Sequence, residues 1–478
     1  MSGINTRETN KALFTNTGII AIGQISTKLI NFFLLPLYTS LLTTEEYGLV
    51  DLLTTYTAFI SVIVGLQMSQ AIFRFLVTSR NDEKRIEEIS STIVVASFIV
   101  ILIYTILFLG LYQIINLQCK WFLLAHVIST LIFQLMSGLA RGLGKNADYA
   151  TGSFISAVVT LVLNVLFIAV FRLNIAFMLA AYAIGPALGC LYLVKRVHIF
   201  RYLRLKSANK KDLKMVLNYA VPLVPNELSW SVIHASDRII VSHFLSIAAN
   251  GLIAVASKFS AIYTTGFSIF NTSWTEQVVL HYKDEGGKKY VNSMFEQMVT
   301  FFGCIAIGII VCMPFVYDIL VDQKFENAYG LVPFYMSAVF FNAVIGMISA
   351  IYLIENETKK IAFSTAIAAA INIFVNILLI KHIGAYAAPV SSICGYAVIS
   401  FWRLYDINKR HCKIGLSYSR LFVLCTMTIF TFVTYYMEST LVHCIVLCVV
   451  AVISVIINKK ILEILFSPIV HLVTKRKN

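Results

Sequence analysis

The sequence predicts an all-α protein that crosses a membrane about fourteen times, and three observations support this fold class. Hydrophobic residues make up 58% of the 478 positions and charged residues only 13%, whereas soluble domains carry roughly 25% charged residues. Apolar runs of about 18 or more residues, each long enough to cross a bilayer as a helix, recur along the chain. Lys and Arg gather between alternate runs, as they do in the cytoplasmic loops of polytopic membrane proteins.

The apolar runs predict fourteen spans in the following order. The first six lie at about 12–42, 49–77, 89–115, 121–143, 150–171 and 175–195. The next six lie at about 216–246, 251–281, 294–318, 331–354, 361–381 and 384–405, and the last two at 419–437 and 440–458. We expect the segment "ILEILFSPIVHLVTKRKN" to be an interfacial amphipathic tail. The polar stretch "MSGINTRETNK" predicts no secretory signal peptide, so the first span would remain in the mature protein.

The distribution of positive charge predicts the orientation. With the amino terminus in the cytoplasm, 31 of the 38 Lys and Arg fall in cytoplasmic segments and four at outer ends. The basic segment "KRVHIFRYLRLKSANKKDLK", residues 195–214, alone holds eight of them. We therefore expect a multi-pass membrane protein with both termini cytoplasmic. The net charge of +14 then lines the inner membrane face, and no nucleic-acid partner is needed to explain it.

No pattern of a cofactor, a metal site or an enzyme is present. The sequence has no HExxH motif and no zinc-like Cys/His spacing, and its nine cysteines are scattered. No loop is long enough to hold a soluble ATPase or transferase domain. The pairs Gly138/Gly142 and Gly185/Gly189 have the GxxxG spacing of close helix packing.

An internal repeat predicts how the spans are grouped. The stretch "GKNADYATGSFISAVVTLVLN", 144–164, aligns without a gap with "NETKKIAFSTAIAAAINIFVN", 356–376. Spans 1–6 and 7–12 would then be two copies with the same membrane orientation, around a central cavity. The predicted parts are an N-terminal six-helix bundle (1–197), a basic cytoplasmic linker (198–214), a C-terminal six-helix bundle (215–410), and two additional helices with a basic cytoplasmic tail (411–478).

Four stretches together resemble one known family. They are "KLINFFLLPLYTSLLTTEEYGLVDL", "AIFRF", "DRIIVSHFLSIAANGLIAVASKFS" and "INIFVNILLIKHIGAYAAPVSSICGY". The chain resembles the Wzx-type polysaccharide flippases, which transport O-antigen, capsule and exopolysaccharide units and form the polysaccharide transporter branch of the MOP exporter superfamily. The resemblance covers most of residues 11–410. It implies two bundles that open alternately to the two faces of a bacterial cytoplasmic (inner) membrane. It also implies an undecaprenyl-diphosphate-linked oligosaccharide as substrate, and polysaccharide polymerase and chain-length proteins as partners.

Charged residues inside spans are the candidate site residues, because charges are costly in the bilayer. The stretch "SWSVIHASDRIIVSHFL" places Asp237 beside Arg238, and Glu227, His234 and Arg238 share one helix face. Polar residues also share a face of spans 1, 2 and 8: Gln24 and Lys28; Gln67, Gln70 and Arg74; Lys258 and Glu276.

A lipid-linked sugar carries a diphosphate with about two negative charges, which fixed cations can compensate. The sequence therefore predicts a substrate-binding set: Lys28, Arg74, His234, Arg238 and Lys258. Without an ATPase domain, uphill transport would need coupling to H⁺ or Na⁺, for which the candidates are Glu227, Asp237 and Glu276. Alternatively, Asp237 and Arg238 each pair with a neighbouring helix as structural residues, and Arg74 reaches lipid headgroups.

Three other functions stay open from the sequence. A lipid II-type flippase of the same superfamily also moves a diphosphate-linked substrate, so cations do not separate it from the polysaccharide branch. A multidrug or cation antiporter of the same fold should have acidic cavity residues, against which Lys28, Arg238 and Lys258 argue. A membrane polymerase or acyltransferase would need a catalytic outer loop, and the sequence shows none.

Overall fold

The computed structural model describes residues 32–114 and 117–463, and every regular element in these ranges is a helix. The chain divides into two compact units. Unit 1 comprises the described part of Met1–Leu42 together with Glu46–Ser236, and unit 2 comprises Thr43–Glu45 and the described part of Asp237–Asn478. The predicted fold class, an all-α polytopic protein, is confirmed.

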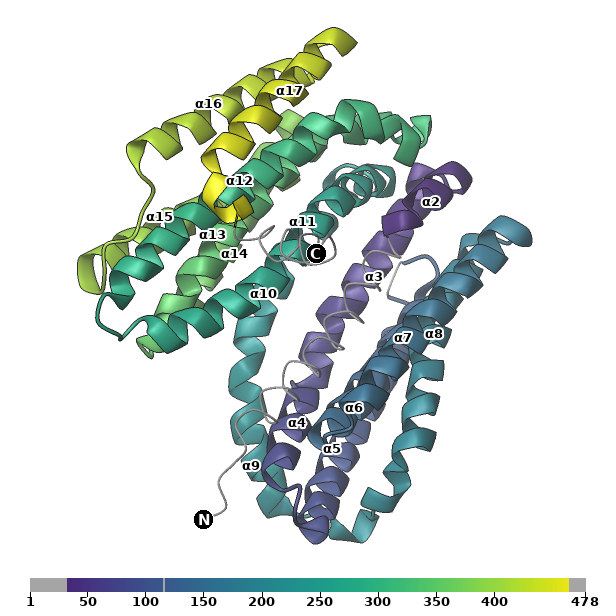
Figure 1. The fold of residues 1–478 in the computed structure, drawn as a ribbon. Helices are drawn as coiled ribbons and strands as arrows, with labels where there is room; N and C mark the ends of the chain where they lie inside the picture. Colours follow the sequence, from purple (N-terminus) through teal and green to yellow (C-terminus); the bar gives the residue numbers. More distant parts are fainter. Residues whose placement is uncertain (1–31, 115–116, 464–478) are drawn as a thin grey trace, which may run out of the picture. The chain divides into compact units, whose positions relative to one another are not determined.

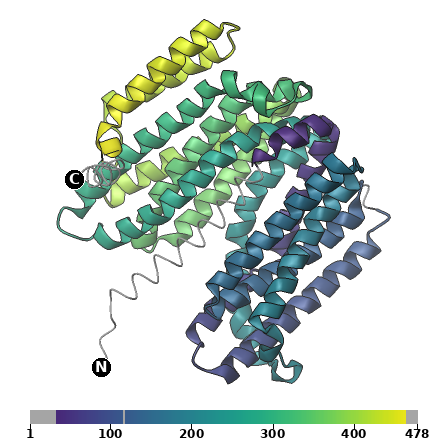
Figure 2. The same cartoon turned by 45° about the vertical axis from the view of Figure 1, so that its right-hand side comes forward.

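The helices of unit 1 follow the apolar runs of the sequence. They are α2 (Leu35–Leu41), α3 (Thr44–Gly65), α4 (Met68–Thr78), α5 (Glu83–Gly110), α6 (Lys120–Gly142), α7 (Asn146–Asn164), α8 (Ile175–Val197), α9 (Lys210–Ala220) and α10 (Val224–Phe244). A π-helical turn, Val165–Val170, extends α7. Helix α10 continues across the unit boundary, so that its residues from Asp237 onward belong to unit 2. Figures 1 and 2 show α6, α7 and α8 packed side by side.

Unit 2 contains the longer helices. They are α11 (Ile247–His281), α12 (Gly287–Leu320), α13 (Val332–Ile354), α14 (Thr358–Ile383), α15 (Ala387–Arg410), α16 (Tyr418–Tyr435) and α17 (Thr440–Ile457). The last two pack against α12 through an apolar cluster that includes Ile307, Met427 and Val446. In Figure 2 this yellow pair lies along one side of unit 2.

Eleven helical stretches in the described ranges are long and apolar enough to cross a membrane, and one of them, Thr358–Arg410, contains both α14 and α15. The protein is therefore a multi-span membrane protein. The figure of about fourteen spans stays a prediction, as do the domain bounds at 197, 214 and 410. Most of the α17 surface is exposed and apolar, as expected for a helix that faces lipid.

Polar side chains fix several helix starts. Asp82 caps α5 by accepting a hydrogen bond from the Arg85 amide at 3.0 Å, and Ser246 caps α11 through the Ala249 amide at 3.0 Å. Each cap satisfies a backbone donor that the helix itself leaves unpaired. These caps fix the first residues of the two helices, a few residues before the predicted apolar runs that begin at about 89 and 251.

The glycine pairs predicted to mediate helix packing do so. A Cβ on Gly138 would collide with the Ser69 carbonyl oxygen of α4, and one on Gly142 would approach the Leu76 Cβ to 2.7 Å. In the same way, a Cβ on Gly185 of α8 would collide with the Thr160 hydroxyl of α7. Only glycine permits the paired helices to approach this closely.

The basic segment 195–214 is tied to the start of α5. The Arg85 guanidinium donates to both carboxylate oxygens of Asp212, at 2.6 and 2.8 Å. The more exposed Arg201 bonds Glu83 at 3.0 Å. Burial alone would raise the pKa of Asp212, but hydrogen bonds from Arg85 and Asn209 hold that pKa below its usual value. Helix α9 is therefore anchored to α5.

Candidate functional site

The second predicted span is interrupted, although the sequence indicated one helix over 49–77. Helix α3 ends at Gly65 and α4 begins at Met68, while Leu66 and Gln67 between them adopt the left-handed φ values of 45° and 55°. Non-glycine residues seldom adopt this conformation. Inside a membrane, a broken helix is tolerated where its freed backbone groups face protein or a polar cavity.

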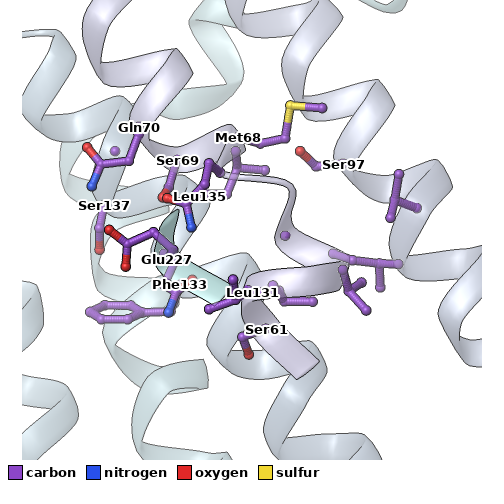
Figure 3. Close-up of a pocket in the computed structure, with 18 of the residues that line it drawn as sticks. Ser61, Met68, Ser69, Gln70, Ser97, Leu131, Phe133, Leu135, Ser137 and Glu227 are labelled. Atoms are coloured by element: carbon purple, nitrogen blue, oxygen red, sulfur yellow. The ribbon is translucent and has the colours of Figure 1, made fainter. Parts of the chain in front are cut away.

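A polar pocket of about 450 Å³ lies at this break, within unit 1 (Figure 3). Residues of α3, α4, α5, α6, α7 and α10 surround it. Its polar lining consists of Ser61, Gln67, Ser69, Gln70, Ser97, Gln134, Ser137, Arg141, Tyr149, Ser153, Glu227 and Ser231. Figure 3 shows Glu227 on the same side of the pocket as Gln70 and Ser137. The break thus places amide, hydroxyl and carboxylate groups around one space.

A second polar cluster surrounds Asp237 in unit 2. The Asp237 side chain is buried, and its Oδ1 accepts hydrogen bonds from the Nδ2 atoms of Asn372 (3.2 Å) and Asn376 (2.9 Å) of α14. Its Oδ2 accepts a hydrogen bond from the Ser392 hydroxyl of α15 at 3.0 Å. A buried carboxylate is costly unless such donors surround it. Three helices therefore converge on one carboxylate.

The repeated stretches end in equivalent contacts in the two units. Asn164, the last residue of the first copy, donates from Nδ2 to the Tyr38 hydroxyl of α2 at 3.1 Å. Asn376, the last residue of the second copy, donates to Asp237. In each unit, the asparagine thus reaches a side chain of the first span of its predicted repeat. This agreement supports the predicted repeat.

The predicted cations lie in different surroundings. Lys28, with Gln24, is outside the described residues. The Arg74 side chain is exposed, and its Cζ lies 4.3 Å from the centre of the Tyr219 ring of α9. Arg238 is half-buried and donates to the Ser257 hydroxyl of α11 at 2.9 Å. Lys258 follows Ser257 and is also half-buried.

The remaining predicted site residues also lie in different parts of the structure. Glu227 lines the unit 1 pocket, whereas Asp237 lies in the unit 2 cluster, so the structure does not place these two in one site. His234 and Glu276 have exposed side chains. Asp237 and Arg238 contact different helices, as their adjacency on one helix predicts. Within the described residues, no group of three or more His, Cys, Asp or Glu could hold a metal ion.

Sequence reasoning missed the partners of Asp237 and the serines of the pocket. The one available signal for the partners was that Asn372 and Asn376 lie one helical turn apart inside an apolar run. Single serines are common in membrane helices, so nothing in the sequence distinguished Ser61, Ser97 or Ser137. Their common location depends on the packing of α3, α5 and α6.

Comparison with known proteins gives one family and one fold. The family described as "Polysaccharide biosynthesis protein" matches residues 13–275. The solved structure of "Lipid II flippase MurJ, inward closed conformation" matches with a TM-score of 0.70 and 15% identity, over 94% of this chain and 99% of that chain. No curated protein sequence matches the chain.

Two further solved structures share the fold. An inward-facing multidrug resistance MATE family transporter of the MOP superfamily matches with a TM-score of 0.58 and 15% identity, over 81% of this chain and 98% of that one. A MOP superfamily transporter from Pyrococcus furiosus matches with a TM-score of 0.53 and 14% identity, over 84% and 95% of the two chains. At these identities the likeness establishes a shared fold.

Proposed function

The chain belongs to the polysaccharide biosynthesis protein family and has the fold of MOP superfamily transporters, and from this premise we propose that it is a flippase for lipid-linked oligosaccharides. Its substrate would be an undecaprenyl-diphosphate-linked unit of a surface polysaccharide, carried across the bacterial cytoplasmic membrane by alternating access. The solved structures that share its fold are transporters rather than enzymes.

The observation that most supports this proposal is the polar pocket in unit 1. A glycan cannot cross hydrocarbon without losing its hydrogen bonds to water. A pocket of about 450 Å³ that is lined by amides and hydroxyls, in a chain of 58% hydrophobic residues, offers replacements for those bonds. The polyprenyl tail can stay in the lipid, because it needs no polar path.

The diphosphate needs compensation of its negative charge. Arg238 and Lys258 are half-buried cations on successive helices of unit 2, and Arg74 lies in unit 1. We assign these three, with Lys28 and His234, to diphosphate recognition. Arg suits bidentate contact with phosphate oxygens, and Lys supplies a point charge.

We further propose that Asp237 couples transport to a cation, Na⁺ or H⁺. Carboxylate and hydroxyl oxygens meet at this position, and the Asn372 and Asn376 amides would add oxygens if they turned over. Hard cations prefer such oxygen ligands. Glu227 and Glu276 are the remaining candidates for ion coupling.

Reconstitution into liposomes tests the main proposal. Labelled undecaprenyl-diphosphate oligosaccharide, extracted from the host strain, is placed in both leaflets, and its exposure to an external glycosidase is followed. We expect the external glycosidase to reach substrate from the inner leaflet only in liposomes that contain the protein. Equal exposure in protein-free liposomes would reject the proposal, and movement of lipid II alone would favour the lipid II-type alternative.

A further inference from the structure

Three serine hydroxyls line the unit 1 pocket without a hydrogen-bond partner. Ser61 of α3, Ser97 of α5 and Ser137 of α6 are 6%, 8% and 7% exposed, and none of their Oγ atoms forms a hydrogen bond within the protein. Figure 3 shows these three side chains around the pocket. Buried hydroxyls are normally satisfied, and leaving one unpaired costs free energy. Three from three helices around one cavity indicate a partner that enters from outside.

The helix break adds further groups to the same wall. The Gln67 and Gln70 side chains line the pocket, and no side chain caps the first turn of α4. Both residues of the break, Leu66 and Gln67, adopt positive φ angles. Strained backbone of this kind persists where the surrounding structure enforces it, often at ligand sites.

The balance of charge indicates the class of ligand. The lining carries one carboxylate, Glu227, and one guanidinium, Arg141. The Arg141 Cζ lies 4.5 Å from the centre of the Phe73 ring and 5.3 Å from that of Tyr149. The other polar groups of the lining are neutral. A diphosphate would require several cations, whereas hydroxyls and amides both donate and accept hydrogen bonds, as the hydroxyls of a sugar do.

We propose that this pocket is a saccharide subsite that takes a neutral sugar residue of the lipid-linked substrate. The proposal rests on the flippase function and adds a location and a charge preference to it. The hydroxyls of Ser61, Ser97 and Ser137 form hydrogen bonds with the sugar hydroxyls. The Glu227 carboxylate accepts hydrogen bonds from the sugar hydroxyls. The Tyr149 ring covers an apolar sugar face. The volume of about 450 Å³ is typical of small-ligand pockets, about 300–1,000 Å³.

The decisive variant combines Ser61→Ala, Ser97→Ala and Ser137→Ala. These changes remove hydroxyls that have no partner in the protein, so we expect the Tm of the purified protein to be unchanged or raised. The matched control is Ser90→Ala, because Ser90 is also a buried, unpartnered serine of α5 but does not line the pocket. Should the triple variant fail to insert, Gln70→Ala replaces it, since the Gln70 side chain is exposed on the pocket wall.

Binding is measured with two probes, the lipid-linked oligosaccharide extracted from the host strain and undecaprenyl diphosphate without sugar. Wild type and Ser90→Ala should bind the sugar-bearing lipid at least about tenfold more tightly, and the triple variant should lose this preference while it keeps its affinity for the bare lipid. A triple variant that keeps the full preference would show that these three hydroxyls do not bind the sugar, and it would overturn this inference without touching the proposed function. If wild type binds neither lipid, the proposed function falls with it.

Discussion

Three hydrogen-bond donors from two other helices surround the Asp237 carboxylate. The charge and the shape of this side chain can be tested separately. Asp237→Asn keeps the shape and removes the charge. If Asp237 binds a coupling cation, we expect this variant to insert at near-normal abundance but to lose any increase of Tm and of transport that Na⁺ or a proton gradient gives to wild type. Thermal unfolding and liposome transport in Na⁺ and in K⁺ buffers measure both effects. If Asp237→Asn responded to these ions as wild type does, the Asp237 carboxylate would have only a structural role.

Arg238 and Lys258 test the diphosphate assignment. Arg238→Ala combined with Lys258→Ala should lower export of surface polysaccharide at least about tenfold, because the substrate's charge would lose two compensating cations. Arg238→Lys should fall between wild type and Arg238→Ala, since it keeps the charge but loses the bidentate fork. Ser257→Ala is the matched control, because it removes the 2.9 Å contact of Arg238 and the bond of the Ser257 hydroxyl to the Ala254 carbonyl but keeps both cations. Abundance must be measured in parallel, because a purely structural Arg238 would lower abundance and export together.

The ionisation of the Asp212 carboxylate should make the stability of unit 1 depend on pH. Its pKa in the folded protein is held below the unfolded value of about 3.9. The stabilisation is therefore present above pH 4 and is lost as the pH falls through the folded pKa. Asp212→Asn should lower the free energy of unfolding by about 1.5–3 kcal/mol at pH 7 and flatten its acid dependence. Glu83→Gln, which breaks the exposed pair with Arg201, should cost only about 0–1 kcal/mol. Thermal unfolding from pH 7 to pH 3 gives both values.

The sequence identified some functional candidates at this scale but not their partners. Asp237 could be singled out because charges are rare inside apolar runs, whereas Asn372 and Ser392 contact it only through the packing of α14 and α15. Charge counting had a further limit at Arg403, which is one of the 31 Lys and Arg counted as cytoplasmic. The Arg403 side chain is fully buried and donates to the Ser349 and Ser364 hydroxyls at 2.7 and 2.6 Å. A charge count cannot separate a solvated arginine from one that is satisfied inside the protein.

At the scale of the element, the close contact of α4 and α6 depends on Gly138. Gly138→Ala would place a Cβ against the Ser69 carbonyl and 2.9 Å from the Ile72 Cγ2, so α6 must move away. We expect a loss of about 1–3 kcal/mol in the free energy of unfolding. Gly266→Ala in α11 is the control, because nothing lies within 4 Å of its added Cβ. It should be neutral or stabilising by up to about 1 kcal/mol. A Gly138→Ala variant as stable as wild type would show that α4 and α6 tolerate separation.

Helix positions followed from hydrophobic runs, but helix breaks did not. A run of apolar residues identifies a span because the bilayer requires length and hydrophobicity, and a two-residue interruption changes neither. Leu66 and Gln67 are neither glycine nor proline, so no local signal marks the break between α3 and α4. The seventh predicted span is divided into α9 and α10. This break was also missed, because the apolar run continues through it, although Pro222 lies in the connecting turn. The pocket of unit 1, which depends on the first break, could therefore not be predicted.

At the scale of the whole molecule, the fold class was predictable because it depends on composition, and composition is a property of the entire chain. The location of the pocket and of the Asp237 cluster depends on contacts between helices that are distant in sequence. Neither the 58% hydrophobic content nor the internal repeat specifies those contacts. The repeat aligned Asn376 with Asn164, yet it could not reveal that a carboxylate lies opposite Asn376.

Membrane orientation is the remaining property of the whole molecule that the charge distribution predicts. In a background without the nine native cysteines, Ser439→Cys and Gln323→Cys should react with an impermeant thiol reagent in intact cells, because both side chains are exposed at predicted outer ends. Lys206→Cys and Lys283→Cys are also exposed but lie at predicted cytoplasmic ends, so they should react only after the membrane is permeabilised. Labelling of Lys206→Cys in intact cells would reverse the orientation. Such a reversal would place the basic α9 region on the outer face.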